Sequence, residues 1–253
     1  MKLTFLGTGT STGVPIVGCR CPVCTSPSPH DKRTRPSVLL EYAGRTVVID
    51  TTPDFRSQAL REKIEHVDAL VFTHAHADHV LGLDDVRPFF FRQQAPIPLY
   101  ADTRSMESLR RIFTYIFEQT YAYGGILKVD PHLIDGPFEL WDERVVPIPV
   151  LHGNLPVLGF RIKKMAYVTD FSAIPEEAIP LLKGLDVLIL DALRYKPHPT
   201  HSTIENSLRL VEQLKPSRAY FTHIAHELQH EEANAKLPPN VQLAYDGLKI
   251  ELD

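Results

Sequence analysis

The segment that most constrains this chain is residues 74–79, His-Ala-His-Ala-Asp-His, which directly follows an apolar, strand-like run. Neutral imidazole nitrogen and carboxylate oxygen suit zinc, manganese and iron, so this hexapeptide is a concentrated set of metal ligands. Alternate residues of an extended segment share a face, which predicts that His74 and His76 point to the same side. Asp78 and His79 then turn toward a second ion. The alternative is a solvated polar loop, but burying these groups without a shared purpose is costly.

Four further candidate ligands lie elsewhere in the chain, and each follows an apolar run with strand character. They are Asp50, His152, Asp170 and His223. A sheet fixes positions while its loops carry chemistry, so side chains delivered from strand ends can meet in one crevice. The sequence therefore predicts that these residues converge on the hexapeptide.

In this order, the hexapeptide and the strand-end residues resemble the metallo-β-lactamase superfamily of dinuclear metal hydrolases, across almost the whole chain. The resemblance implies an α/β (α+β) fold, the four-layer αββα sandwich. The implied ligands are His74, His76 and His152 for the first metal, Asp78, His79 and His223 for the second, and Asp170 as the bridge. Asp50 is implied to lie behind the ligands, where it would hydrogen-bond the loop and fix imidazole orientation.

The pattern of apolar residues agrees with two mixed sheets and outer helices. Strands are predicted near residues 3–7, 37–49, 69–72, 97–100, 145–169, 187–191, 219–222 and 241–252. Helices are predicted near residues 55–63, 80–92, 104–118, 175–183 and 203–214. A chain of 253 residues with 43% hydrophobic content can bury a substantial core, so one domain over 1–253 is expected.

Charge and cysteine content exclude several classes of function. The formal net charge of −4 argues against extended nucleic-acid binding, which normally shows as an excess of Lys and Arg, and leaves a local basic patch open. The first apolar stretch is too short for a secretory signal, and no stretch is long enough to span a bilayer. Three clustered cysteines suit a reducing compartment. We therefore expect a cytoplasmic protein without a membrane partner.

The glycine-rich segment at residues 7–15 reads Gly-Thr-Gly-Thr-Ser-Thr-Gly-Val-Pro. It lacks the Gly-Lys-Ser/Thr ending of a nucleotide P-loop and the Gly-x-Gly-x-x-Gly fingerprint of dinucleotide sites. We interpret it as a tight loop whose glycines let the backbone approach the metal crevice. An ordinary flexible turn is the alternative.

Cys19, Cys21 and Cys24 lie so close together that a tetrahedral zinc site lacks only one ligand. The leading candidate is His226, three residues after His223, because Cys₃His is a common closed set for structural zinc. The alternative is that the three reduced thiols pack as small hydrophobic groups.

The cysteine cluster, the Gly-Thr-Gly-Thr entry and the ending Tyr-Asp-Gly-Leu at 245–248 together resemble the cyclic-phosphate phosphodiesterase family of the bacterial phosphonate-degradation (carbon-phosphorus lyase) pathway. The resemblance implies hydrolysis of a phosphoribosyl cyclic phosphate with two divalent ions, Mn²⁺ or Zn²⁺. It also implies one structural Zn²⁺ near residues 19–24. By position, its ligands would be Cys19, Cys21, Cys24 and His226.

The same resemblance implies a histidine beside the leaving group, just before the helix that precedes the last ligand strand. His201 fits this position best, and His198 in the same string is the alternative general acid; a capping role for His201 is a third reading. Asp78 is assigned a catalytic role in addition to metal binding. Arg194 and Lys196 are weaker candidates for contact with a second phosphate or a ribose, and they equally suit a solvated surface.

The expected activity is hydrolysis of a small or cyclic phosphodiester by a metal-bridging hydroxide, with a histidine as general acid. Two alternatives stay open. A tRNA 3′-processing-type ribonuclease shares the metal loop but usually carries a basic arm, and no insertion rich in Gly, Lys and Arg occurs between His79 and Asp170. A non-hydrolytic relative like the pyrroloquinoline quinone biosynthesis protein B shares the cysteine knot. A homodimer is left open, and the aromatic residues at 89–91 and 113–123 are predicted to pack in a core or dimer contact.

Overall fold

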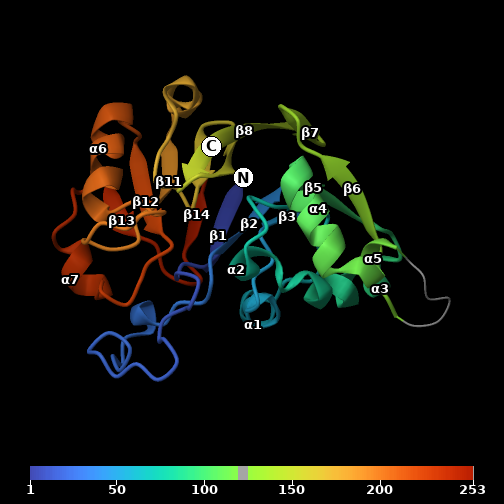
Figure 1. Ribbon diagram of the computed structural model, residues 1–253, viewed down its shortest axis with the longest axis horizontal. Coiled ribbons are helices and arrows are strands. Elements are labelled where there is room, and N and C mark those ends of the chain that lie inside the picture. Colours follow the sequence, from blue (N-terminus) through green and yellow to red (C-terminus); the bar gives the residue numbers. More distant parts are fainter. Residues whose placement is uncertain (119–124, 253) are drawn as a thin grey trace.

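The chain forms two seven-stranded sheets with helices on both outer sides (Figure 1), as seen in a computed structural model that describes residues 1–118 and 125–252. In spatial order, the first sheet contains β14 (Lys249–Glu251), β1 (Lys2–Gly7), β2 (Ser37–Tyr42), β3 (Arg45–Ile49), β4 (Ala69–Val71), β5 (Ile97–Ala101) and β6 (Val129–Leu133). The second contains β13 (Val241–Leu243), β12 (Arg218–Thr222), β11 (Val187–Asp191), β10 (Met165–Val168), β9 (Leu155–Ile162), β8 (Glu143–His152) and β7 (Phe138–Leu140).

Both sheets are mixed, and their parallel parts position the functional residues. Strands β3 to β6 run parallel in the first sheet, and strands β10 to β13 run parallel in the second. Parallel strands end at the same edge of their sheet, where ligand sites of such sheets commonly form. The residues that follow β3, β4, β10 and β12 therefore lie at corresponding edges of the two sheets.

The helices flank the sheets on opposite sides of the molecule, α1 to α5 on one side and α6 and α7 on the other (Figure 1). Their bounds are Phe55–Glu62 (α1), Ala77–Val80 (α2), Arg87–Gln93 (α3), Thr103–Ile112 (α4), Thr114–Phe117 (α5), Ile204–Leu214 (α6) and His230–Asn234 (α7). The described residues also form 3-10 helices at Pro29–Asp31 (η1), Leu83–Val86 (η2) and Glu176–Leu182 (η3).

Side chains of the preceding residues define where α4 and α6 begin. The Asp102 carboxylate accepts a hydrogen bond from the Ser105 backbone N–H at 2.7 Å. The Thr203 hydroxyl accepts one from the Asn206 N–H at 3.2 Å. Each cap satisfies a backbone donor that has no partner inside its helix.

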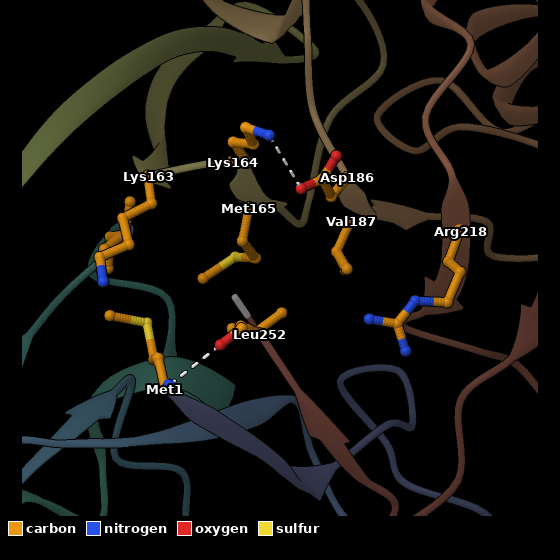
Figure 2. A pocket seen from close by; sticks show the side chains of 9 residues that line it. Met1, Lys163, Lys164, Met165, Asp186, Val187, Arg218 and Leu252 are labelled. Atoms are coloured by element: carbon orange, nitrogen blue, oxygen red, sulfur yellow. Dashed lines mark hydrogen bonds and ion pairs between the residues drawn. The ribbon is translucent and has the colours of Figure 1, made fainter.

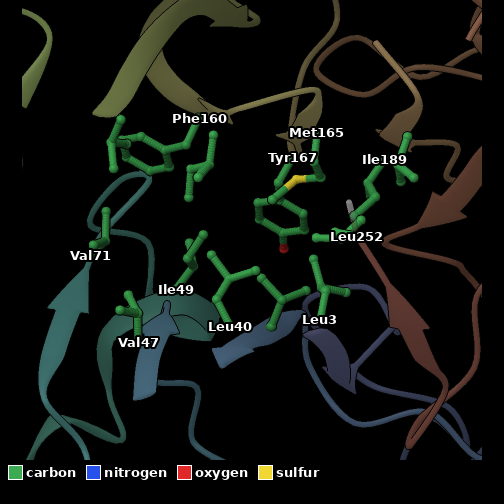
Figure 3. Packing of buried hydrophobic residues seen from close by; sticks show 14 of the residues in the cluster. Leu3, Leu40, Val47, Ile49, Val71, Phe160, Met165, Tyr167, Ile189 and Leu252 are labelled. Atoms are coloured by element: carbon green, nitrogen blue, oxygen red, sulfur yellow. The ribbon is translucent and has the colours of Figure 1, made fainter. Parts of the chain in front are cut away.

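Three apolar clusters fill the layers. The central cluster lies between the two sheets and combines residues such as Leu40 and Ile49 of the first with Phe160 and Tyr167 of the second (Figure 3). A second cluster packs α6 and η3 against the outer face of the second sheet. The third packs α1, α3 and α4 against the first sheet. The predicted four-layer αββα sandwich is thus confirmed.

Several element predictions were wrong in detail. The run predicted at 241–252 is divided between the two sheets, β13 in one and β14 in the other, with a turn between them that includes Gly247 at a φ of 88°. The helix predicted at 175–183 is the 3-10 helix η3, and Pro180 inside it lacks the N–H that an α-helix requires. Strands β6 and β7 and helix α7 were not predicted from the sequence.

At the sheet edge opposite the candidate ligands, the two chain ends meet (Figure 2). The Met1 amino group donates to the Leu252 carbonyl at 2.9 Å. A narrow cavity of about 20 Å³ lies beside them, near the ion pair between Lys164 and Asp186 at 3.4 Å. The starts of β10, β11 and β12 line it, so it is separate from the ligands that follow the ends of these strands. In the parts of the chain that the structure describes, the helices are too short or too polar for a membrane span.

Candidate metal centre

Three of the strand-end residues adopt a backbone conformation that is unusual for residues other than glycine. The φ angles are 64° at Asp50, 52° at Asp170 and 59° at His223, all in the left-handed region. Such conformations cost of order 1–3 kcal/mol each and concentrate at functional sites, where the surrounding structure imposes them. All three side chains are buried and belong to one connected cluster.

The first group of candidate ligands is His74, His76 and His152, whose potential ligand atoms all lie within 4.8 Å of one another. The Nδ1–H of His152 donates to the carbonyl oxygen of Thr200 at 2.7 Å, which leaves Nε2 free to bind a metal. His74 and His152 are buried and His76 is exposed. This group therefore lies at the boundary between the core and solvent.

The second group is Asp78, His79, Asp170 and His223, all four of them buried. The Oδ1 atom of Asp170 lies 3.4 Å from His79 Nε2 and 3.3 Å from His223 Nε2. Its other oxygen lies 3.9 Å from His74 Nε2, in the first group. Asp170 thus lies between the two groups, where its carboxylate could contact a metal held by either.

Asp50 orients the second group from behind. Its carboxylate accepts hydrogen bonds from the Thr73 N–H at 2.8 Å, the Thr73 hydroxyl at 2.7 Å and His79 Nδ1–H at 2.7 Å. Burial raises the pKa of the Asp50 carboxyl, and the contact with His79 opposes this effect. With Nδ1 engaged, His79 Nε2 is the nitrogen that faces Asp78 and Asp170.

The electrostatics of the buried cluster follow from its carboxylates. Burial alone would lower the pKa of His223, but Asp170 and Asp78 outweigh it and raise the pKa to about 9. Burial, reinforced by His79, lowers the pKa of His74 well below its usual value. A site with this much negative charge attracts cations, and histidine and carboxylate donors suit divalent metals.

Unpartnered nitrogens show that this donor set fits metal ions. The Nε2 atoms of His74, His79 and His223 are buried and have no hydrogen-bond partner among the described residues. A buried polar atom without a partner carries a desolvation cost that a bound metal removes. We conclude that the two groups can each hold a divalent cation.

His201 lies against both groups. Its ring centroid is 4.6 Å from that of His152 and 4.6 Å from that of His223. Its Nδ1–H donates to Asp191 Oδ2 at 2.8 Å, and Asp191 is completely buried. Burial raises the pKa of the Asp191 carboxyl, with the His201 contact opposing it. Asp191 was not predicted from the sequence, although it ends β11 and the predicted ligands also lie at strand ends.

The alternative histidine and the predicted basic contacts have other partners. His198 Nδ1 accepts a hydrogen bond from the Thr200 N–H at 3.3 Å, and its ring is 5.0 Å from that of His201. The Arg194 guanidinium pairs with Glu227 at 3.2 Å and donates to two carbonyl groups of its own loop. Lys196 is exposed. His201 therefore lies beside the two groups of candidate ligands, whereas the Arg194 guanidinium is bound to Glu227 and to its own loop.

The cysteines form a separate cluster. The Sγ atoms of Cys19, Cys21 and Cys24 lie 3.3, 3.4 and 3.5 Å from Nδ1 of His226. No disulfide links these thiols. A hydrogen bond from the Cys24 backbone N–H is the main cause that lowers the pKa of Cys21 to about 6, which favours the thiolate that binds metal. Four soft or borderline donors at these distances suit a tetrahedral zinc ion.

The glycine-rich loop packs beside the last ligand strand. Gly9 pairs with Ile224, the residue after His223, and Thr10 N–H donates to the Ile224 carbonyl at 3.1 Å. A Cβ atom on Gly7 would lie 1.9 Å from the carbonyl oxygen of Arg35. The loop is therefore packed too tightly for a side chain at that position.

Of the predicted aromatic contacts, Phe89 and Phe113 lie in the core, Phe91 is partly exposed, and residues 119–124 lie outside the described part of the chain.

Comparison with known proteins gives matches over most of the chain. The family model described as the beta-lactamase superfamily domain matches residues 45–224. The crystal structure of a new diphosphatase from the PhnP family is 51% identical, has a TM-score of 0.94 and covers 100% of this chain and 98% of that one. Zn²⁺-bound PqqB from Methylobacterium extorquens is 21% identical with a TM-score of 0.80 and covers 100% of both chains, a likeness of fold.

A curated relative is longer. The octanoyltransferase of Porphyromonas gingivalis is 41% identical over 257 residues, which cover 100% of this chain and 52% of that protein. The chain thus spans about half the length of this relative. The activity in that name belongs to the longer protein.

Proposed function

The chain belongs to the metallo-β-lactamase superfamily, near a diphosphatase of the PhnP family, and is a metal-dependent hydrolase; from this premise we propose that it is a phosphodiesterase. Its proposed substrates are small or cyclic phosphodiesters of the phosphoribosyl cyclic phosphate type. The 51% identical relative is a diphosphatase, which adds substituted diphosphates as a second candidate class. In both classes, two of the oxygens on the attacked phosphorus are each bonded to a further group, as an ester or an anhydride. One of these two oxygens must leave.

Two divalent ions, Mn²⁺ or Zn²⁺, are proposed as the resident cofactors. His74, His76 and His152 would hold one, Asp78, His79 and His223 the other, and Asp170 would contact both. When bound, such ions lower the pKa of water toward neutrality and neutralise phosphate charge, which favours attack at phosphorus. Asp50 would keep the His79 ring oriented through its 2.7 Å hydrogen bond.

The observation that carries the proposal is the pair formed by His201 and Asp191 beside these ligands. An alkoxide is a poor leaving group, and cleavage is faster when an acid protonates it as the bond to phosphorus breaks. Asp191 accepts the Nδ1–H of His201, so the proton available for transfer is on Nε2. Transfer of this proton to the departing oxygen can contribute roughly 10²–10⁴-fold to the rate.

A structural zinc is proposed for the cluster of Cys19, Cys21, Cys24 and His226. Its ligands come from two distant parts of the chain, since His226 follows β12 and the cysteines follow β1. A closed site of this kind contributes to folding and has no open position for substrate. It would fasten the loop after β1 to the segment that carries His223.

Turnover of a defined substrate panel tests the proposal. Metal-loaded wild-type protein is assayed on bis-p-nitrophenyl phosphate, on 1,2-, 2′,3′- and 3′,5′-cyclic phosphates, and on a substituted diphosphate. We expect metal-dependent hydrolysis of at least one class, abolished by a chelator and restored by Mn²⁺ or Zn²⁺. Bound metal without turnover of any member would favour a non-hydrolytic role, and cleavage of pre-tRNA alone would favour a ribonuclease.

A further inference from the structure

A cavity of about 220 Å³ adjoins the first group of candidate ligands. We name it the α4 cleft; its lining includes His74, His76, Arg104, Ser105, Ser108 and Pro156. One wall therefore consists of candidate metal ligands and another of the first two turns of α4. A molecule held by the metals would extend directly into this space.

Arg104 supplies the positive charge of the cleft. It is the second residue of α4, its side chain is exposed, and it forms no ion pair within residues 1–118 and 125–252. The nearby Asp102 carboxylate caps the Ser105 N–H at 2.7 Å. By contrast, Arg87 and Arg194 are paired with Asp84 and Glu227. The guanidinium of Arg104 is thus available for an anion, which it can bind through two parallel hydrogen bonds.

The cleft lies away from the proposed general acid. The rings of His74, His76 and His152 lie 4.6 to 5.7 Å from one another, and His201 lies 4.6 Å from His152. His74 and His76 line the cleft, whereas His152 and His201 do not. A leaving group beside His201 therefore leaves the cleft to the part of the substrate that stays attached to the attacked phosphorus.

We propose that the α4 cleft binds a second phosphoryl group of the substrate, with Arg104 as its charged contact and the Ser105 and Ser108 hydroxyls as polar neighbours. This inference rests on the proposed function, because it assumes that a phosphorus-containing substrate reaches the metal groups. Arg104 is then a residue that determines specificity. It makes compounds with two phosphoryl groups better ligands than compounds with one.

The test compares two probes that are not hydrolysed, methylenediphosphonate with two phosphoryl groups and methylphosphonate with one. Their dissociation constants are measured by calorimetry on Mn²⁺-loaded wild type, Arg104→Gln, Arg104→Lys and Arg110→Gln. Arg110 is the matched control, because it lies on the same helix but stacks over Phe117, outside the cleft. All four proteins are first shown to hold equal amounts of metal.

We expect Arg104→Gln to reduce the preference for methylenediphosphonate over methylphosphonate about tenfold, the size expected for one charge-assisted contact. Arg104→Lys should restore part of the preference, and Arg110→Gln should match wild type. An unchanged preference in Arg104→Gln would overturn the inference. Turnover of bis-p-nitrophenyl phosphate by wild type is a separate readout: its absence would remove the proposed function, whereas the ratio of dissociation constants tests the cleft alone.

Discussion

The Nδ1 atom of His201 lies 2.8 Å from Oδ2 of Asp191, and the His201 ring stacks on that of His223 with an interplanar angle of 17°. Asp191 is completely buried at the end of β11, so this hydrogen bond holds a largely buried histidine in one orientation next to the candidate ligands. In the proposed reaction, this pair supplies the proton for the leaving oxygen.

Substitution of His201 by alanine should slow substrates in proportion to how poor their leaving group is. We expect a decrease in kcat of roughly 10²–10⁴-fold for an alkyl phosphodiester, which needs a proton on the departing oxygen. The effect on bis-p-nitrophenyl phosphate should be much smaller, because p-nitrophenolate leaves without protonation. His198→Ala is the matched control. Equal losses on both substrates would remove the general-acid role from His201.

Asp191 should act through His201. The Asp191→Asn variant is expected to lower kcat on the alkyl substrate, because the amide no longer fixes the Nδ1–H of His201. Residues that act as one unit give non-additive effects, so the double variant Asp191→Asn, His201→Ala should be no slower than His201→Ala. Kinetics of the four proteins at saturating substrate provide the measurement. Additive losses would mean that Asp191 has an independent role.

Replacement of Cys24 by serine should release the structural zinc while the other metals stay bound. We expect metal content to fall by one ion per chain and Tm to fall by about 5 °C or more, because metal binding and folding are coupled at closed sites. Mass spectrometry for metals and thermal unfolding check this. Ser26→Ala, in the same loop, is the control. A Cys24→Ser protein with unchanged metal content would favour the reading that the thiols only pack.

Stability should decrease as the pH falls from about 6.5 to about 4. Burial, followed by the Arg33 guanidinium 2.9 Å away, lowers the pKa of His230 to about 4. The unfolded chain, with an ordinary histidine pKa, binds the proton first as the pH falls, so the free energy of unfolding falls as the pH is lowered through this window and is unaffected by His230 above it. The slope of this pH dependence is set by the number of protons taken up on unfolding, and His230→Gln should lower that number by up to about one.

Urea unfolding at pH 7, 5.5 and 4.5 measures this dependence. The same slope in the His230→Gln and wild-type proteins would contradict the assignment of this pH dependence to His230.

The sequence predicts the parts of the site whose signals are local or end a clear strand. The hexapeptide at 74–79 is recognisable because its ligands are neighbours in the chain, and Asp50, Asp170 and His223 each follow an apolar run. Asp191 follows one too, but a single acidic residue at a strand end has no spacing that distinguishes it from an ordinary surface carboxylate. Its role becomes visible only when the fold brings His201 to it.

Long-range arrangement is what the sequence leaves undetermined. The segment after residue 241 has one continuous strand-like pattern, yet β13 pairs with β12 and β14 pairs with β1. This choice depends on which sheet edge is free, a property of the whole fold. Arg104 is likewise one exposed arginine among others in the sequence, and the α4 cleft beside His74 distinguishes it.

The central claim is that the two groups of candidate ligands each hold one cation. Anomalous diffraction from crystals grown with Mn²⁺ tests it most directly. We expect two anomalous peaks per chain, one among His74, His76 and His152 and one among Asp78, His79 and His223, with Asp170 in contact with both. Data from an Asp170→Ala crystal should show weaker occupancy at the two positions. The absence of any peak at these residues in fully loaded wild-type crystals would contradict the account.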